Sequence, residues 1–490
     1  MKTKLLFTLL SWAVISIGQA QWSIDSVNTP GVFPYAAVNG SKAVFSNGGE
    51  WNIFDAVTGA HTFGNFTTSR QMIEVVSLGN KIFFGGGKYG YFADPQYTKQ
   101  VNVYNSTTNT WSIWNMGTAR EVGAAAGTGT KVLFAGGTGR TDIAGPVYIY
   151  NKVDIFDINT GARTSGKLSK ARTNIAAGAA GNKVVFAGGW YWDMMYNTVY
   201  SNKADIYDVS TGLWTNVLLS KKRDNISVAV IGDKILFAGG SGNMGAVNNV
   251  DIYNASTNTW SVTYMPVAGY SFKTAVNGTD AYFAGYPYGV LNAIYKYNSL
   301  TGIWSTLYLP TSLSGFSMRV IDGRLIFAGG TLPGTNTYSN LVQIYDPVSN
   351  AWSTEYLSMA RTNVSVLSIG NIGYFVGGIK TYGYPTPIYT HRVDIFNAPF
   401  RYEASEFVMP DWSLKVYPNP ATRMIMIGVD NDAVLPLQAA IIDQQGHKAL
   451  EFMIYDEQTR VDVGALPAGV YFIAATDTRG HHETVKLIKQ

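Results

Sequence analysis

Recurring arginines are the side chains whose type and spacing best suit chemistry, and that chemistry is the binding of anions. They stand at the start of strand-like segments in successive stretches of similar sequence: Arg120, Arg172, Arg223, Arg319 and Arg361, with Arg70 and Lys273 as further candidates. A guanidinium donates paired hydrogen bonds to a carboxylate or a sulfate. A ring of them would bind such a group, whereas a local partner such as Glu121 or Asp224 would make each one a structural ion pair. The sequence leaves both interpretations open.

Aromatic residues in long loops form a second set of candidate binding side chains. The set comprises Tyr89, Tyr91, Trp190, Trp192, Tyr288 and Tyr384. Sugars present apolar faces and polar edges, and aromatic rings beside cations match both. The alternative is that these rings only pack on one another and order their loops.

Composition excludes several classes of protein. The chain has 490 residues, a formal net charge of +4, 13% aromatic residues and no cysteine. Many aromatic residues and a low net charge argue against disorder. A charge of +4 over this length is not a concentrated basic block, so nucleic acid is not an expected partner. Without cysteine there is no disulfide, thiolate zinc site or cysteine nucleophile, and the sequence indicates no cofactor and no metal.

Internal repeats organise residues 21–397. A strand-like run that ends in a glycine pair recurs in steps of about 38 to 52 residues, as in residues 132–137 and 184–189. A second run with Tyr or Phe follows each pair, and in most copies a Trp comes about seven residues later. Each copy therefore predicts four short antiparallel strands, a to d. The glycine pairs are expected where backbones crowd near a central axis.

These repeats resemble the kelch-repeat β-propeller family, which shares the glycine pair, the downstream Tyr and the later Trp. The resemblance implies an all-β propeller with eight blades, or with seven, since the first copy is short. The last copy ends after strand c, and Gln21-Trp22-Ser23-Ile24 has the pattern of a strand d without a sheet. We therefore expect residues 22–27 to pair with residues 393–397 and close the ring.

Antiparallel strand order places the b–c loops and the d–a connections at one face, and the tight a–b turns at the other. The arginines and the aromatic loops should therefore share the b–c face, and loops without a repeat signature often carry function. Our leading hypothesis is a secreted or cell-surface, non-catalytic protein whose b–c face binds a glycan or an anionic protein segment. A structural adhesin of the cell surface is an alternative.

Enzymatic alternatives are narrower. Some kelch propellers are copper-radical oxidases, but that cofactor needs a cysteine-linked tyrosine and two histidine ligands, and the repeats hold only His61 and His391. A glycosidase needs two carboxylates across one cleft, and the loops show no such pair. For a polysaccharide lyase or a sugar mutarotase, Tyr389, His391 and Arg392 could supply a phenolic acid, a general base and a charge stabiliser. A lone histidine is more often a polar loop residue.

The two ends of the chain predict export. Residues 1–20 have a basic start, a short apolar run and small residues before Gln21, which is the pattern of a cleaved signal peptide. The apolar run is too short to span a membrane. Residues 398–413 form a linker, and alternating apolar residues in 414–490 predict a small β-sandwich.

The C-terminal module resembles the sorting domain of type IX secretion cargo. The shared segments are Tyr417-Pro418-Asn419-Pro420, the Leu-Pro-Ala-Gly-Val-Tyr of residues 466–471, and the basic end Lys486-Leu487-Ile488-Lys489. The resemblance implies export to a periplasm, passage through the outer membrane, and the type IX secretion machinery as a partner. No transmembrane segment is expected. An ordinary immunoglobulin-like binding domain is the alternative.

Overall fold

The computed structural model describes residues 21–91, 94–141, 145–285, 292–335, 337–382, 386–398, 412–429, 435–444, 446–477 and 482–490. The expected signal peptide lies outside them. Regular secondary structure in the described residues consists of β-strands, and no helix there is long and apolar enough to cross a membrane. The chain divides into two units, Met1–Phe400 and Arg401–Gln490.

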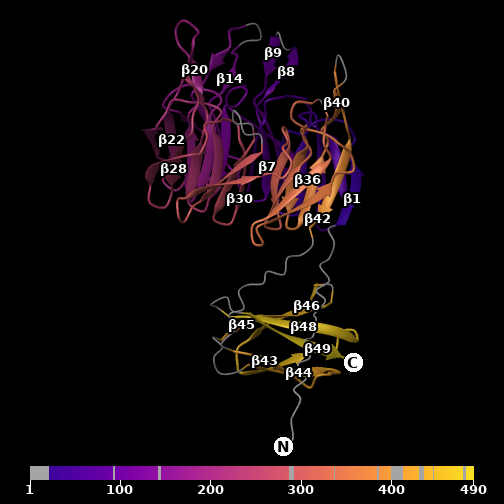
Figure 1. The fold of residues 1–490 in the computed structure, drawn as a ribbon. Helices are drawn as coiled ribbons and strands as arrows, with labels where there is room; N and C mark the ends of the chain where they lie inside the picture. The colour runs from indigo at the N-terminus through magenta and orange to yellow at the C-terminus, as the bar shows by residue number, and fades with distance from the viewer. Residues whose placement is uncertain are drawn as a thin grey trace, which may run out of the picture. The chain divides into compact units, whose positions relative to one another are not determined.

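The first unit repeats a four-stranded antiparallel sheet, and we number these sheets 1 to 8 within the described residues (Figure 1). Strands a to d of sheets 1 to 4 are, in order, β2 (Tyr35–Asn39), β3 (Lys42–Ser46), β4 (Glu50–Asp55), β5 (His61–Asn65); β6 (Glu74–Leu78), β7 (Lys81–Gly85), β10 (Gln100–Asn105), β11 (Thr110–Asn115); β12 (Ala124–Thr128), β13 (Lys131–Ala135), β16 (Lys152–Asp157), β17 (Arg163–Lys167); β18 (Ala176–Ala180), β19 (Lys183–Ala187), β22 (Lys203–Asp208), β23 (Trp214–Leu218).

Strands a to d of sheets 5 to 8 follow the same order, except that strand d of sheet 8 comes from the beginning of the chain. They are β24 (Ser227–Ile231), β25 (Lys234–Ala238), β28 (Asn249–Asn254), β29 (Thr259–Tyr264); β30 (Lys273–Asn277), β31 (Asp280–Ala284), β32 (Ala293–Asn298), β33 (Trp304–Tyr308); β34 (Ser317–Ile321), β35 (Arg324–Ala328), β36 (Leu341–Asp346), β37 (Ala351–Tyr356); β38 (Ser365–Ile369), β39 (Ile372–Val376), β42 (Arg392–Asn397), β1 (Gln21–Ser26).

Strand b is buried on both faces where a sheet packs between two neighbours, as sheet 4 does between sheets 3 and 5. The four residues after Lys183 in β19 are all buried, which matches their unbroken apolar run. One buried cluster joins Leu133 and Ile155 of sheet 3 to Phe186 and Tyr207 of sheet 4. The hydrophobic core of this unit therefore consists of layers between successive sheets.

The glycine pairs directly follow strand b, as in sheet 3, where β13 ends at Ala135. Gly136 and Gly137 have φ angles of 61° and 96°, a region that L side chains rarely adopt. A Cβ atom on Gly137 would lie 1.9 Å from the carbonyl oxygen of Glu121. The expected close approach of backbones is present, but it involves the segments that lead into strand a.

The beginning of the chain pairs with its last repeat, as predicted. Strand β1 lies antiparallel to β42, with Trp22 opposite Phe396, and the two rings are 4.8 Å apart. The tyrosine of strand c meets the Trp of strand d at the same register in sheet 4, where Tyr207 and Trp214 are 4.9 Å apart. Trp22 therefore supplies the Trp that the last copy lacks.

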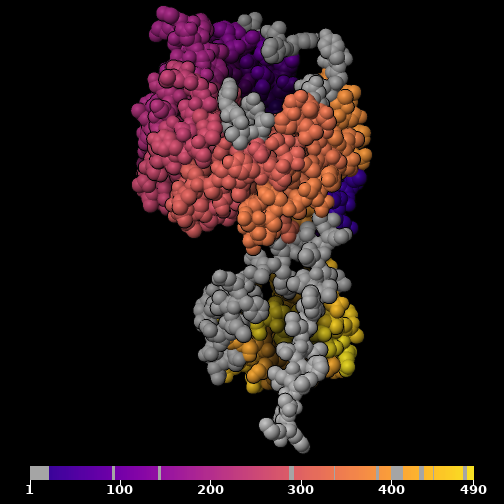
Figure 2. All heavy atoms as spheres, in the orientation of Figure 1, coloured from indigo at the N-terminus to yellow at the C-terminus, as the bar shows by residue number. Residues whose placement is uncertain are grey.

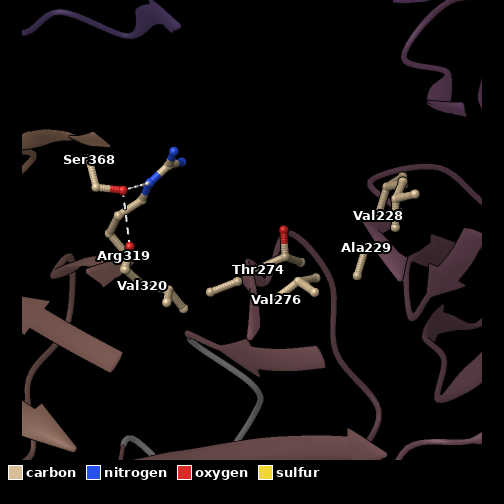
Figure 3. A pocket seen from close by; sticks show the side chains of 9 residues that line it. Val228, Ala229, Thr274, Val276, Arg319, Val320 and Ser368 are labelled. Carbon is tan, nitrogen blue, oxygen red and sulfur yellow. Dashed lines mark hydrogen bonds between the residues drawn. The ribbon is translucent and has the colours of Figure 1, made fainter. Parts of the chain in front are cut away.

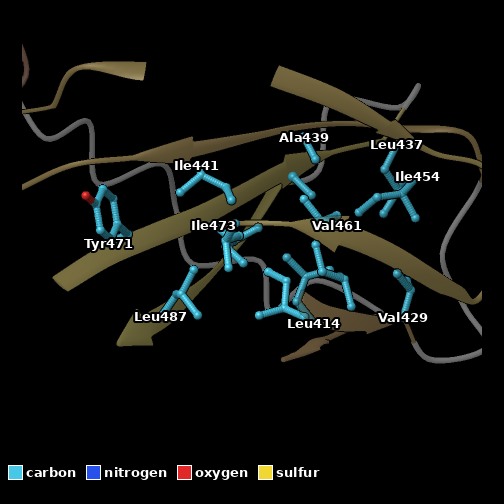
Figure 4. Packing of buried hydrophobic residues seen from close by; sticks show 14 of the residues in the cluster. Leu414, Val429, Leu437, Ala439, Ile441, Ile454, Val461, Tyr471, Ile473 and Leu487 are labelled. Atoms are coloured by element: carbon cyan, nitrogen blue, oxygen red, sulfur yellow. The ribbon is translucent and has the colours of Figure 1, made fainter. Parts of the chain in front are cut away.

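The second unit has two sheets that share one core. Strands β43 (Leu414–Tyr417), β44 (Met424–Val429) and β47 (Gln458–Asp462) form one sheet, and β46 (Lys448–Ile454), β45 (Leu437–Ile442), β48 (Gly469–Thr476) and β49 (His482–Lys489) form the other. Ile441, Ile473 and Leu487 from the second sheet meet Leu414 and Val461 from the first (Figure 4). The alternating apolar residues of these strands supply this core.

Trp22→Ala tests the contribution of β1. The substitution removes the ring that contacts Phe375 and Phe396, so we expect a loss of about 3 kcal/mol in the free energy of unfolding. Ile24→Ala on the same strand is the control, because Ile24 is 55% exposed and should change stability by less than about 0.5 kcal/mol. Denaturant unfolding of the full chain measures both. Equal losses of unfolding free energy in the two variants would contradict a stabilising role of the Trp22 ring.

Candidate ligand-binding face

Five β-hairpins connect strands b and c in the described residues and project from the same end of their sheets (Figure 1). They are β8–β9 (Lys88–Tyr91, Asp94–Tyr97), β14–β15 (Thr138–Gly139, Tyr148–Ile149), β20–β21 (Trp190–Trp192, Thr198–Tyr200), β26–β27 (Ser241–Gly242, Gly245–Ala246) and β40–β41 (Ile379–Tyr382, Pro387–Tyr389). We call this end of the unit the b–c face. The a–b turns at the other end are short, as between Asn39 and Lys42.

Four of the recurring arginines are fully buried and form ion pairs with strand c of their own sheet. Each pair has a shortest nitrogen–oxygen distance of 2.7 Å: Arg120 with Asp154, Arg172 with Asp205, Arg223 with Asp251 and Arg361 with Asp394. Each guanidinium also donates to the carbonyl of the phenylalanine at the fourth position of strand b, as Arg172 does to Phe186 at 2.9 Å. Burial lowers the pKa of these arginines, and the carboxylates oppose that shift.

A ring of these arginines that binds a ligand is therefore wrong for Arg120, Arg172, Arg223 and Arg361, because no guanidinium surface is open to solvent. These arginines form structural ion pairs, but their partners are not the acidic residues next to them in sequence. Glu121 pairs with Lys88 at 3.1 Å, and Asp224 accepts hydrogen bonds from Asn174 and Asn225. The carboxylates that the arginines need come from about 30 residues further along the chain.

The buried carboxylate also holds the connection between two sheets. Asp205 accepts a hydrogen bond of 2.9 Å from the backbone N–H of Ser169, and Asp394 accepts one of 3.0 Å from Ser358. Ser169 and Ser358 lie in the segments that join strand d of one sheet to strand a of the next. Each pair therefore fixes the place where the chain passes between two sheets.

Arg319 is not equivalent to these arginines. It lies third in β34, and the structure places Leu313 at the repeat position that Arg361 occupies, as the backbone hydrogen bonds of Gly330 and Ser314 show. Its Nε donates to the Oγ of Ser368 at 3.1 Å, and Ser368 donates to the carbonyl of Val320. Lys273 likewise lies first in β30, four residues beyond the repeat position.

Arg319 lines a cavity of about 410 Å³ formed by residues from β24, β30, β34 and β38. The end of its guanidinium points away from Ser368 into open space, with Thr274 and Val228 further along the wall (Figure 3). Burial lowers the pKa of Arg319. Among the described residues no carboxylate pairs with it, so this predicted site residue keeps donors available for an anion.

Aromatic side chains gather on the hairpin β20–β21. The rings of Trp190 and Trp192 are 5.6 Å apart, and Tyr196 at the tip contacts Trp192 at 6.4 Å. Tyr196 is 78% exposed, and the hairpin projects beyond the body of the sheets (Figure 2). Lys170 lies 4.2 Å from the ring centre of Tyr191. The rings thus pack on one another and remain partly exposed, so their packing is observed and their role in binding stays a prediction.

The other predicted aromatic residues are placed only in part. Tyr89 in β8 is 41% exposed on the same face. Tyr288, Tyr384 and the side chain of Tyr91 lie outside the described residues.

The catalytic candidates are neighbours in the chain at the start of β42. Tyr389 ends β41, Arg392 begins β42, and His391 lies between them. The carbonyl of His391 accepts a hydrogen bond of 2.9 Å from the backbone N–H of Val27. This contact involves only the backbone of His391, and a catalytic role of its side chain stays a hypothesis.

Glu74 is a titratable residue that the sequence did not single out. It is the first residue of β6, and burial raises its pKa to about 7, aided by Glu121 and opposed by a hydrogen bond from the backbone of Ala125. A single Glu in a strand of alternating residues gives no sequence signal of burial. Only the packing of neighbouring strands shows that its carboxyl group is removed from water.

Asp205→Ala tests the buried ion pair. The substitution leaves the guanidinium of Arg172 buried without a charge partner, which should cost about 3–5 kcal/mol of unfolding free energy. Asp233→Ala is the control, because Asp233 is exposed in an a–b turn, and it should cost less than about 0.5 kcal/mol. Urea unfolding compares the two, and similar losses would contradict the structural role of the pair.

Glu74→Gln tests the raised pKa. The folded-state pKa of about 7 exceeds the ordinary value of 4.5, so folding disfavours the charged carboxylate. Burial of this group therefore does not lower the free energy of unfolding at a pH below about 4.5. The loss of unfolding free energy grows as the pH rises to about 7. We expect Glu74→Gln to raise the melting temperature at pH 8 and to change it little at pH 4. A gain that is the same at both pH values would contradict this.

Comparison with known proteins agrees with both units. Residues 415–490 match the family model of the secretion system C-terminal sorting domain. Residues 222–263 and 312–355 match the kelch motif, and they cover most of sheet 5 and sheet 7. A comparison with curated proteins finds no match. The chain therefore contains kelch repeats and a C-terminal sorting domain, and the sorting domain indicates export by type IX secretion to the cell surface or the extracellular space.

Proposed function

We propose that sheets 1 to 8 form one closed, eight-bladed propeller. Strand a of sheet 8 contacts strand a of sheet 1, and a single buried cluster contains Phe45 and Phe54 of sheet 1 with Val376 and Val393 of sheet 8. The pairing of β1 with β42 links the two ends of the repeat array. A closed ring covers the outer faces of the first and last sheets and leaves only short, protected sheet edges, which suits a chain built from short strands.

The protein acts, in this proposal, as a non-catalytic binding protein that recognises glycans on its b–c face. The observation that supports this most is the set of hairpins at that face, because they interrupt the repeat and carry exposed aromatic residues. Trp190 and Trp192 are partly exposed, and Lys170 lies against the ring of Tyr191. Flat rings beside cations match the apolar faces and polar edges of a sugar.

Residues 398–490 then serve export, and the type IX secretion machinery is the partner of the module at 414–490. The match to the sorting domain supports this role. Residues 1–20 would direct the first export step, and residues 398–413 would link the two units. An exported protein meets polysaccharides at the cell surface, so its destination and a glycan ligand agree.

A glycan array tests the proposal with the full chain. We expect the wild type to bind at least one class of glycan and Trp192→Ala to bind it about tenfold more weakly, because a stacking face is lost. Tyr455→Ala is the matched control, since Tyr455 is an exposed ring of the second unit, 67% accessible, and should leave binding unchanged. A wild type that binds no glycan would reject the proposed function.

A further inference from the structure

Sheet 3 departs from the repeat at one place on its strand d. Arg163 stands opposite Phe156 in the register where sheet 4 places Trp214 opposite Tyr207. Sheets 5 and 7 also have a Trp at this register, and sheet 8 has Trp22. A cation has therefore replaced an aromatic residue at a position that packs between two sheets elsewhere.

Two neighbouring residues make this replacement possible. Trp114 of sheet 2 packs on Phe156 at 5.6 Å, so a Trp from the preceding strand d fills the aromatic space beside Phe156. Gly117 lies where other connections carry a serine such as Ser169, and a Cβ atom there would be only 2.8 Å from Nη1 of Arg163. The neighbourhood is thus adapted to hold an arginine.

The local charge balance differs from that of the other buried pairs. Asp154 accepts from Arg120 at 2.7 Å and from Arg163 at 2.8 Å, whereas Asp205, like Asp251 and Asp394, has one arginine partner. Lys152 and Lys167 lie beside them, and in the described part of the chain neither pairs with a carboxylate. Four cations against one carboxylate leave an excess of three positive charges.

These residues surround a cavity of about 480 Å³. Its wall consists of Gly117, Thr118, residues 152–154, Arg163 and residues 165–167. Lys152 donates to the hydroxyl of Thr118 at 2.6 Å and lies 5.0 Å from the ring centre of Tyr150. Lys152 begins β16 and Lys167 ends β17, so the cavity opens at the b–c face.

We infer that this cavity binds the sulfate or carboxylate group of an acidic glycan. The inference rests on the proposed glycan binding and adds the class of sugar and the place of its charge. Arg163 presents its guanidinium, 37% exposed and fixed by Asp154, while Lys152 and Lys167 add charge from two sides. A cavity of this volume has room for a sugar ring with its charged group. The hydroxyl of Thr118 suits the polar edge of that ring.

Titration calorimetry of the full chain with a sulfated oligosaccharide, a uronic-acid oligosaccharide and a neutral oligosaccharide tests the inference. We expect the acidic sugars to bind at least tenfold more tightly than the neutral sugar, with an advantage that shrinks as salt rises. Lys167→Gln and Arg163→Gln should each remove about tenfold of that advantage. Lys222→Gln, an exposed lysine in the connection before β24, is the matched control and should change nothing.

The outcomes separate the two proposals. Binding of the neutral sugar with no preference for acidic ones, or an equal preference in Lys167→Gln, would overturn the acidic site and leave glycan binding standing. Failure of every sugar to bind would reject the proposed function itself. Lys167 is exposed, so Lys167→Gln should keep the wild-type melting temperature, which shows that a loss of affinity is not a loss of fold.

Discussion

In four of the described sheets a buried ion pair joins the preceding connection to the sheet that this connection enters. A guanidinium and a carboxylate lose several kcal/mol each when they leave water, and they recover this only when every donor and acceptor has a fitting partner. In sheet 4 the carboxylate of Asp205 has the Arg172 guanidinium and the backbone N–H of Ser169. Arg172 also donates to the carbonyl of Phe186, but its Nε and Nη1 have no hydrogen-bond partner among the described residues. The connection before sheet 4 and its strands b and c must therefore meet at one point. The ion pair thus contributes more to the specific placement of successive sheets than to the free energy of unfolding.

The second constraint is the volume between sheets, which aromatic rings must fill because protein interiors are close-packed. The chain fills it in three ways. Sheet 4 uses its own Trp214, sheet 8 uses Trp22 from the other end of the chain, and sheet 3 uses Trp114 from its neighbour. The need to fill this space explains why the two ends of the repeat array meet, and why position 163 was free to become an arginine.

Departures from the repeat coincide with the surfaces that we propose for binding. Residues that recur in several sheets, such as Arg172 and Trp214, are held by packing and ion pairs inside the unit. The hairpin β20–β21, the cavity beside Arg163 and the guanidinium of Arg319 each belong to one sheet. A repeated structural position has the same neighbours in every sheet, whereas a binding site needs a set of neighbours that occurs once.

Much of the architecture followed from the sequence, because alternation, glycine pairs and turn residues act within a few positions of the chain. The strands, their antiparallel order, the pairing of Trp22 with the last repeat and the C-terminal sorting module could all be predicted in this way. Only the tertiary structure decided which cations are buried and which are open. The partner of Arg172 is Asp205, 33 residues away, and the partner of a side chain at that distance depends on how whole strands pair. The arginines that the sequence grouped together therefore include both members of structural ion pairs and Arg319, whose guanidinium has no carboxylate partner in the described residues. Only the folded structure distinguishes the two kinds.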